Sequence, residues 1–282
     1  MDEFDLAYLW RLIWWGLTPE EEIINTFTTY IKGQRIEAPD LREHYHRFQQ
    51  QKETLLLDFN KEHFLKLEAA FYSLNHQGIL AIHYAGSTMS AGHTVASETL
   101  RDLYKEVTQY RFPIDLSTIK GYCFYHEQDI EPLVPTLETN NLPKASFNLA
   151  FGSFDEVVSV VEIGQCITTV LEQKELPYEW SQEAESRILL KDFVWGKEND
   201  SINWGNKALD DLLGEHRAQR MQQNQDCIFE KNQKVSILEG VFKNYEGVIK
   251  DIKADGKTLV VEVVIFGRKT LVELHKNILV LL

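Results

Sequence analysis

Small residues surround two serines, two threonines and a histidine in the segment AGSTMSAGHT (85–94), which we place between a buried strand and a helix. Backbone N–H groups at the start of that helix could hold an anion. The segment matches neither the P-loop nor the G-x-S-x-G elbow, because it lacks their lysine and glycine spacing. An ordinary capped turn is therefore the alternative interpretation. The candidate ligand positions are Gly86, Ser87, Thr88, Gly92 and His93.

His126 is a second candidate for chemistry, because it stands beside carboxylates in YHEQD (125–129) at the expected end of a strand. A histidine in such a place can act as a general base or a metal ligand. Successive side chains of a strand point to opposite faces, so Tyr125 and Glu127 share one side and His126 faces the other. The alternative is a capped turn with His126 bonded to backbone. One hypothesis is therefore an enzyme that uses the 85–94 segment with His126 or His93.

Metal binding is not indicated by the histidines or the cysteines. In HYH (44–46), a helical conformation would place the two histidines about 200° apart, too far to bind one ion. Cys123, Cys166 and Cys227 fit neither a zinc site nor a disulfide framework. We expect no metal, no cofactor and no assignable catalytic residue, so an enzyme is the less favoured class.

Charge is distributed unevenly along the 282 residues, which carry a formal net charge of −14. Residues 228–282 hold nine Lys/Arg and seven Asp/Glu, net +2, and the preceding residues are net −16. Because nucleic-acid binding depends on neutralising phosphates, the acidic part is a poor candidate for it, and RNA contact by the C-terminal part would be weak. An acidic surface instead suits a basic protein partner, such as a toxin bound by an immunity-type protein, or it serves solubility alone.

The length suggests roughly two domains, and the apolar content of 44% is sufficient for buried cores. No apolar run is long enough to span a bilayer, and the start, MDEFDLAYLW, is acidic where a secretory signal is basic. We therefore expect a cytoplasmic protein with no membrane partner and with reduced thiols.

The elements that must position these residues form an α+β pattern. The first 77 residues are expected to be helical, with helices over 4–15, from Pro19, and from about 60 to Gly78. Strands and helices then alternate over 78–198, which predicts a mixed or antiparallel sheet. The expected strands are 78–86, 119–126, 145–152, YEW (178–180) and 186–193, and the expected helices are about 94–109 and 154–174. We predict an acidic body over 1–198 and a polar linker with a helix over 199–227.

Five short β-rich runs follow the linker: KVSIL, GVIKDIK, TLVVEVVIF, KTLVEL and ILVL. Asp255-Gly256 provides a hairpin turn between the second and third runs. About 50 residues with five strands can close into a small barrel, with sharp corners at Gly240, Gly247 and Gly267. Residues 228–282 are therefore predicted to be an all-β domain.

Residues in these runs carry a family resemblance. VSILEGVFKNYEGVIKDI followed by VVIFGRKTLVEL resembles the KOW domain at the C-terminus of NusG-type transcription elongation factors. The resemblance implies an SH3-like barrel that docks on proteins, a ribosomal small-subunit protein or a termination factor. Val241 and Leu271 stand where proline is common in that family. The positions that match its docking surface are Phe242, Tyr245, Ile265, Phe266 and Arg268.

The middle of the chain, about 55–198, resembles an uncharacterised bacterial domain family. The resemblance rests on GYCFYHEQDIE (121–131), FNLAFGSFD (147–155), VEIGQCI (161–167) and RILLKDFVW (187–195). The resemblance implies a folded domain of bacterial origin and gives no indication of a catalytic activity. The leading hypothesis is therefore a non-catalytic protein-binding protein, whose barrel docks on the translation or transcription apparatus.

Overall fold

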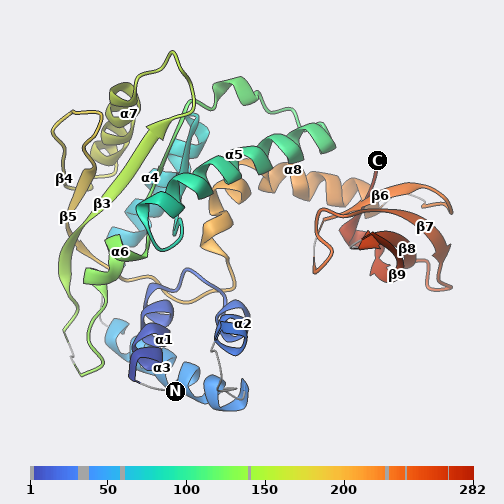
Figure 1. Cartoon of the computed structure of the whole chain (residues 1–282), viewed down its shortest axis with the longest axis horizontal. Helices are drawn as coiled ribbons and strands as arrows, with labels where there is room; N and C mark the ends of the chain where they lie inside the picture. Colours follow the sequence, from blue (N-terminus) through green and yellow to red (C-terminus); the bar gives the residue numbers. More distant parts are fainter. Residues whose placement is uncertain are drawn as a thin grey trace. The chain divides into compact units, whose positions relative to one another are not determined.

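The computed structural model describes residues 3–30, 38–57, 61–138, 141–225, 229–238, 240–265 and 267–282 (Figure 1). The chain divides into two compact units. The body unit comprises Met1–Lys105 and Pro113–Leu212, and the C-terminal unit comprises Glu106–Phe112 and Leu213–Leu282. The predicted division of the domains at residues 198 and 228 stays a prediction.

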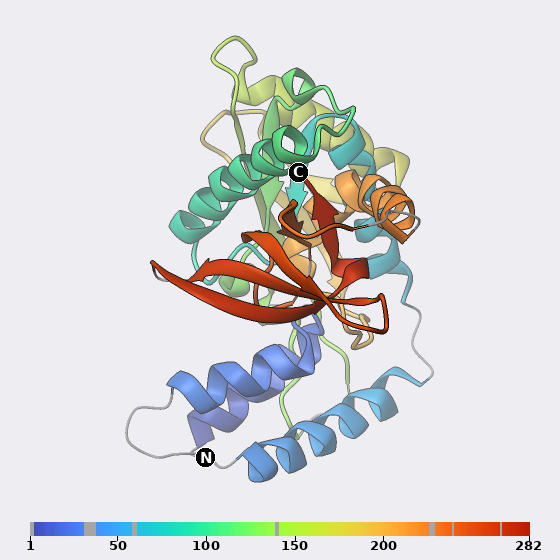
Figure 2. The ribbon, with the colours of Figure 1, turned by 90° about the vertical axis from the view of Figure 1, so that its right-hand side faces the viewer.

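Helices make up the first third of the body unit, as expected. They are α1 (Glu3–Trp15), α2 (Glu20–Tyr30), α3 (Ala38–Leu56) and α4 (Glu62–His76). The helices α1 and α2 both pack against α3 (Figure 2). Trp10, Trp14 and Trp15 of α1 donate their indole N–H groups to the carbonyl oxygens of Pro135, Leu133 and Ile130. These bonds fix α1 to a segment more than a hundred residues away and satisfy the polar atom of each buried indole.

A mixed five-stranded sheet forms the rest of the body core, as the sequence predicted. Its strand order is β1-β2-β3-β5-β4. The pair β1–β2 is parallel, and the other pairs are antiparallel. The helix α4 packs against β1, and α7 packs against β2 and β3. The strands are β1 (Ile79–Ile82), β2 (Gly121–Phe124), β3 (Lys144–Ser153), β4 (Tyr178–Glu179) and β5 (Ile188–Val194), and the remaining helices are α5 (Met89–Tyr110), α6 (Glu127–Ile130), α7 (Val160–Gln173) and α8 (Lys207–Gln225).

The apolar stripe of α4 is buried as its spacing predicts. Five apolar residues at helical spacing are buried: Phe64, Leu67, Ala70, Phe71 and Leu74. The helix stops just before Gly78, whose φ of +82° favours glycine. A side chain there would also lie 2.1 Å from the carbonyl oxygen of Thr118, so the close approach to the chain entering β2 requires glycine.

The C-terminal unit contains an antiparallel five-stranded sheet, ordered β10-β6-β7-β8-β9. Alternate residues of β8 point inward, and Leu259, Val261 and Val263 are buried. The predicted hairpin turn is confirmed, because Gly256 has φ of +63° and the Asp255 carboxylate accepts from the backbone N–H of Thr258 at 2.9 Å. The bounds are β6 (Lys234–Ile237), β7 (Glu246–Ile252), β8 (Thr258–Ile265), β9 (Arg268–His275) and β10 (Leu279–Leu281). Among the described residues no pairing joins β9 to β10, so this sheet is open there.

The last turn of α5 and most of α8 belong to the same C-terminal unit. Arg217 donates twice to the buried Glu106 carboxylate, from Nε at 3.0 Å and from Nη2 at 2.7 Å. Arg220 donates to the carbonyl oxygens of Tyr110 at 2.7 Å and Leu281 at 3.2 Å. Polar bonds therefore join the two helix ends to each other and to the edge strand β10. None of the helices in the described part of the chain is long and apolar enough to cross a membrane.

Candidate functional site

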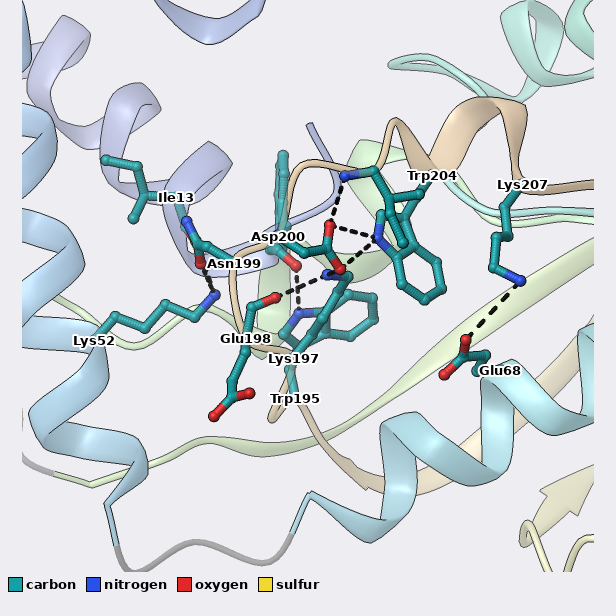
Figure 3. Close-up of polar contacts among 12 residues, drawn as sticks. Ile13, Lys52, Glu68, Trp195, Lys197, Glu198, Asn199, Asp200, Trp204 and Lys207 are labelled. Atoms are coloured by element: carbon teal, nitrogen blue, oxygen red, sulfur yellow. Dashed lines mark hydrogen bonds and ion pairs between the residues drawn. The ribbon is translucent and has the colours of Figure 1, made fainter. Parts of the chain in front are cut away.

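The segment that follows β5 brings lysine and tryptophan side chains to the end of α1 (Figure 3). Trp195 donates its indole N–H to the carbonyl oxygen of Trp15 at 3.0 Å. Lys52, from α3, donates to the carbonyl oxygen of Ile13 at 3.0 Å and to the side-chain oxygen of Asn199. The last carbonyl groups of a helix have no intrahelical partner. The bonds to the carbonyl oxygens of Trp15 and Ile13 therefore satisfy such groups at the end of α1.

A second lysine, Lys197, is buried in the same segment. Its ammonium donates to Asp200 at 2.8 Å and to the carbonyl oxygen of Glu198 at 2.8 Å. It lies 4.4 Å from the ring centre of Trp204, whose indole N–H donates to the same Asp200 carboxylate. Lys207 lies 5.7 Å from that ring. Trp204 therefore packs against two cations, and attraction to the face of the ring favours both.

Burial changes the acid–base behaviour of this cluster. The pKa of Lys52 is well below its ordinary value, because burial disfavours the charged form and the charge of Lys197 adds to this. Burial also lowers the pKa of Lys197, although its bond to Asp200 opposes the shift. The pKa of His83 is held well below its usual range by burial and then by the charges of Lys207 and Lys197. His83 is therefore neutral at pH 7, and its Nδ1 lies 2.8 Å from the hydroxyl of Tyr125.

A cavity of about 400 Å³ opens between α3 and the segment after β5. This volume lies in the range of small-molecule sites. Among the residues that line it are Lys52, Glu53, Leu56, Lys61, Glu198 and Asn199. The wall therefore combines apolar surface with amine, carboxylate and amide groups. Glu198 is held by an ion pair with Lys61, whereas Lys52 makes no ion pair within the described part of the chain.

Sequence reasoning missed this cavity and its lysines. Lys197 and Trp204 lie in or beside the segment that we interpreted as the start of a polar linker, yet both are buried. The one available signal was the pair of tryptophans, Trp195 and Trp204, because large aromatic residues in a polar stretch need something to pack against.

The structure brings part of the 85–94 segment next to His126. Because β1 and β2 are parallel, their C-terminal ends meet at one edge of the sheet, where α/β proteins commonly bind ligands. The N–H of Ala85 donates to the carbonyl oxygen of Tyr125 at 2.9 Å, and that of Glu127 donates to Gly86 at 3.0 Å. Ser87 is exposed nearby, and Thr88 Oγ1 accepts from the N–H of Ala91 at 3.3 Å, which is the capped turn of the alternative interpretation.

His126 is partnered by one of the carboxylates that follow it in YHEQD (125–129). Its Nε2 lies 3.2 Å from Asp129, one turn away in α6, and Asp129 also accepts from Arg187 at 2.8 Å. His126 Nδ1 is buried without a hydrogen-bond partner in the described residues. Burial lowers the pKa of His126 and raises that of Asp129. A neutral His126 that donates from Nε2 therefore keeps Nδ1 as a proton acceptor, but the ring is buried.

His93 and Gly92 have structural partners instead. The Nδ1 of His93 lies 2.9 Å from the hydroxyl of Tyr122, and its ring packs edge-on against Phe124. A Cβ at Gly92 would lie 2.0 Å from the ring of Phe124, so packing alone accounts for the glycine.

We expect Gly92→Ala to lower the free energy of unfolding by about 1–3 kcal/mol, because the added methyl overlaps a buried ring. Urea denaturation of the full chain measures this loss. Gly214→Ala is the matched control, since a Cβ there meets nothing within 4 Å. Equal stability of Gly92→Ala and the control would contradict the packing explanation.

The predicted docking residues lie in the C-terminal unit and differ in exposure. Tyr245 is 37% exposed, and Arg268 is also exposed. Phe242 and Ile265 are partly buried and pack against the core of the unit. The rings of Phe242 and Tyr245 meet edge to face, 6.5 Å between centres. Phe266 lies outside the described residues.

Two comparisons with known proteins found matches to this chain. A family described as a domain of unknown function (DUF6891) matches residues 5–199. The transcription termination/antitermination protein NusG of Liberibacter asiaticus is 41% identical over 49 residues, which are 17% of this chain and 70% of that protein. The first match extends well beyond the segment 55–198 in which we saw a bacterial domain. The second has the length of the predicted NusG-like region and supports that resemblance in part.

Proposed function

The chain belongs to the DUF6891 family, and we propose that this member is a non-catalytic binding protein whose C-terminal unit docks on the transcription or translation apparatus. The observation that carries the proposal is the 41% identity over 49 residues to a transcription termination/antitermination protein. The charge distribution supports a protein partner, because a net charge of +2 over residues 228–282 is a weak footprint for nucleic acid.

The loop between β6 and β7 is the best-placed docking element. Val241 is 89% exposed and Tyr245 is 37% exposed, so the loop presents an apolar and an aromatic side chain to solvent. Phe242 packs inward and supports the ring of Tyr245. A partly exposed tyrosine on a fixed support is typical of binding hot spots, because little side-chain freedom is lost on binding.

The proposal includes a closed SH3-like barrel of the NusG type. The strand order supports it, because the last strand, β10, pairs with the first, β6, and β6 to β9 form a meander. A β-bulge between Ile249 and Asp251 in β7 also increases curvature. Closure requires β9 to meet β10, which hydrogen exchange of the outward amides of these strands would test.

We expect Tyr245→Ala to weaken capture of a ribosomal small-subunit protein or a termination factor from bacterial lysate by about 30-fold, corresponding to about 2 kcal/mol. The reason is loss of a central aromatic contact. Leu271→Ala is the matched control, because Leu271 is a 61% exposed apolar residue of β9 outside the predicted docking positions. Both variants must keep the amide spectrum of the folded C-terminal unit.

Other outcomes of the same experiment decide between the alternatives. Equal capture by wild type and Tyr245→Ala would contradict docking by this loop, and capture that disappears with nuclease would contradict a protein partner. Capture of a basic toxin that is lost at high salt would favour the immunity-type hypothesis, since exposed charges are screened beyond about 8 Å at physiological ionic strength. An enzyme that uses His126 stays the third hypothesis, and its support is the pairing of His126 with Asp129.

A further inference from the structure

The Lys52 amine has the hydrogen bonds of a neutral amine. Its two acceptors are the carbonyl oxygen of Ile13 and the side-chain oxygen of Asn199. A neutral amine has two N–H donors and one lone pair, whereas an ammonium group has three donors. Lys52 is 2% exposed, and among the described residues no carboxylate lies within ion-pair distance of it. The two acceptors match the two N–H donors of a neutral amine, and the nitrogen also lies 6.0 Å from the ring centre of Trp14.

The surrounding charges favour the same protonation state. Burial is the main cause of the lowered pKa of Lys52, and the positive charge of Lys197 adds to it. Asp200, Glu198 and Glu53 act in the opposite direction. Two of these carboxylates form ion pairs with other lysines: Asp200 with Lys197, and Glu198 with Lys61. A buried lysine beside another cation is the usual environment of a nucleophilic amine.

The cavity lies beside the buried side chain of Lys52. Lys52 and Asn199, which are hydrogen-bonded to each other, both line the cavity of about 400 Å³. Gly16 makes room beside them, since a Cβ there would lie 3.0 Å from the Lys52 nitrogen. Lys61 lines the same cavity, but its ammonium is paired with Glu198. Of these two cavity lysines, Lys52 is therefore the one without an ion pair in the described residues.

We propose that Lys52 is a nucleophile that forms an imine with a small aldehyde or ketone bound in this cavity. The lone pair of the amine nitrogen forms a bond to the carbonyl carbon, and one amine proton passes to the carbonyl oxygen. The resulting hydroxyl then leaves with the second proton as water, and a carbon–nitrogen double bond remains. The step consumes the amine and the carbonyl compound only. This site is separate from the docking loop of the proposed function.

Reductive trapping on the wild-type full chain tests the proposal. The protein is incubated with acetaldehyde, or with pyruvate, and sodium cyanoborohydride, and the adducts are located by peptide mass spectrometry. We expect Lys52 to be modified at pH 7 at least about tenfold faster than the exposed Lys105 and Lys257, because an ordinary lysine is almost fully protonated there. Pyruvate and acetaldehyde distinguish a ligand that carries a carboxylate from one that does not.

The pH dependence distinguishes a nucleophile from a merely structural lysine. Relative to Lys105 and Lys257 in the same sample, the rate at Lys52 is expected to fall as the pH rises from 7 to 9, because the free-amine fraction of an ordinary lysine rises about tenfold per pH unit there and that of Lys52 rises less. Lys105→Met, an exposed position outside the cavity, should keep the fast adduct, and Lys52→Met should lose it. Modification of Lys52 at or below the rate of the exposed lysines would overturn the proposal and leave Lys52 as a cap of α1.

Discussion

Replacing Arg217 with methionine is expected to lower the free energy of unfolding of the C-terminal unit by about 3–5 kcal/mol. The substitution keeps an apolar stem and removes both bonds to Glu106, which are 3.0 and 2.7 Å long. The Glu106 carboxylate is buried, so it would remain as a charge without its main partner. Hydrogen exchange of the amides of β6, β7 and β8 measures the loss within the unit.

Two further variants make this prediction specific. Arg101→Met removes an exposed pair with Glu98, 3.8 Å long on the same helix, and is expected to cost less than about 1 kcal/mol. The double variant Arg217→Met with Glu106→Gln should recover much of the lost stability, because the remaining amide carries no charge. If Arg217→Met costs no more than Arg101→Met, the pair does not hold the unit together.

Strands with one buried face were predictable from the sequence. In TLVVEVVIF the residues Leu259, Val261 and Val263 alternate with outward residues, and the structure buries all three. The turn at Asp255-Gly256 was equally predictable, because its geometry depends on residues that are adjacent in the sequence. Closure of the barrel could not be predicted in this way, since it depends on whether the two edge strands, β9 and β10, pair with each other.

Contacts between residues close in the sequence left a signal, whereas contacts between distant residues did not. The partner of His126 is only three residues away, and a His-x-x-Asp spacing at a strand end was an available signal for the α6 turn. The burial of Lys52 had no such signal, because its partners, Ile13 and Asn199, lie 39 and 147 residues away. A lysine in a polar helix is expected to be exposed, and only the packing of α1 against α3 and the segment after β5 overrides that expectation.

Raising the pH toward 10 is expected to stabilise the wild-type body unit relative to Lys52→Met. The pKa of Lys52 is lowered in the folded state by burial and then by Lys197, whereas the unfolded chain has an ordinary lysine pKa of about 10.4. Between those two values the unfolded state binds a proton that the folded state does not. The free energy of unfolding then rises with pH by about 1.4 kcal/mol per pH unit for this group.

His83 is expected to make the free energy of unfolding depend on pH in the acid range as well. Its folded pKa is lowered well below the unfolded value of about 6.5, first by burial and then by Lys207 and Lys197. Below pH 6.5 the unfolded state therefore takes up a proton that the folded state does not, and stability falls as the pH falls. His83→Gln, which can keep a bond to the Tyr125 hydroxyl, should reduce this acid slope and leave the alkaline one unchanged.

Other buried groups act in the opposite direction at high pH, so the comparison must be made between variants. Burial raises the pKa of the Cys123 thiol, which keeps its proton when the unfolded thiol loses it above about pH 8.5. The same slope is present in wild type and in Lys52→Met, and it cancels in their difference. Urea denaturation at intervals between pH 5 and 10 measures that difference. Curves that run parallel from pH 7 to 10 would show that Lys52 is protonated in the folded protein, and would remove the neutral amine on which its reactivity depends.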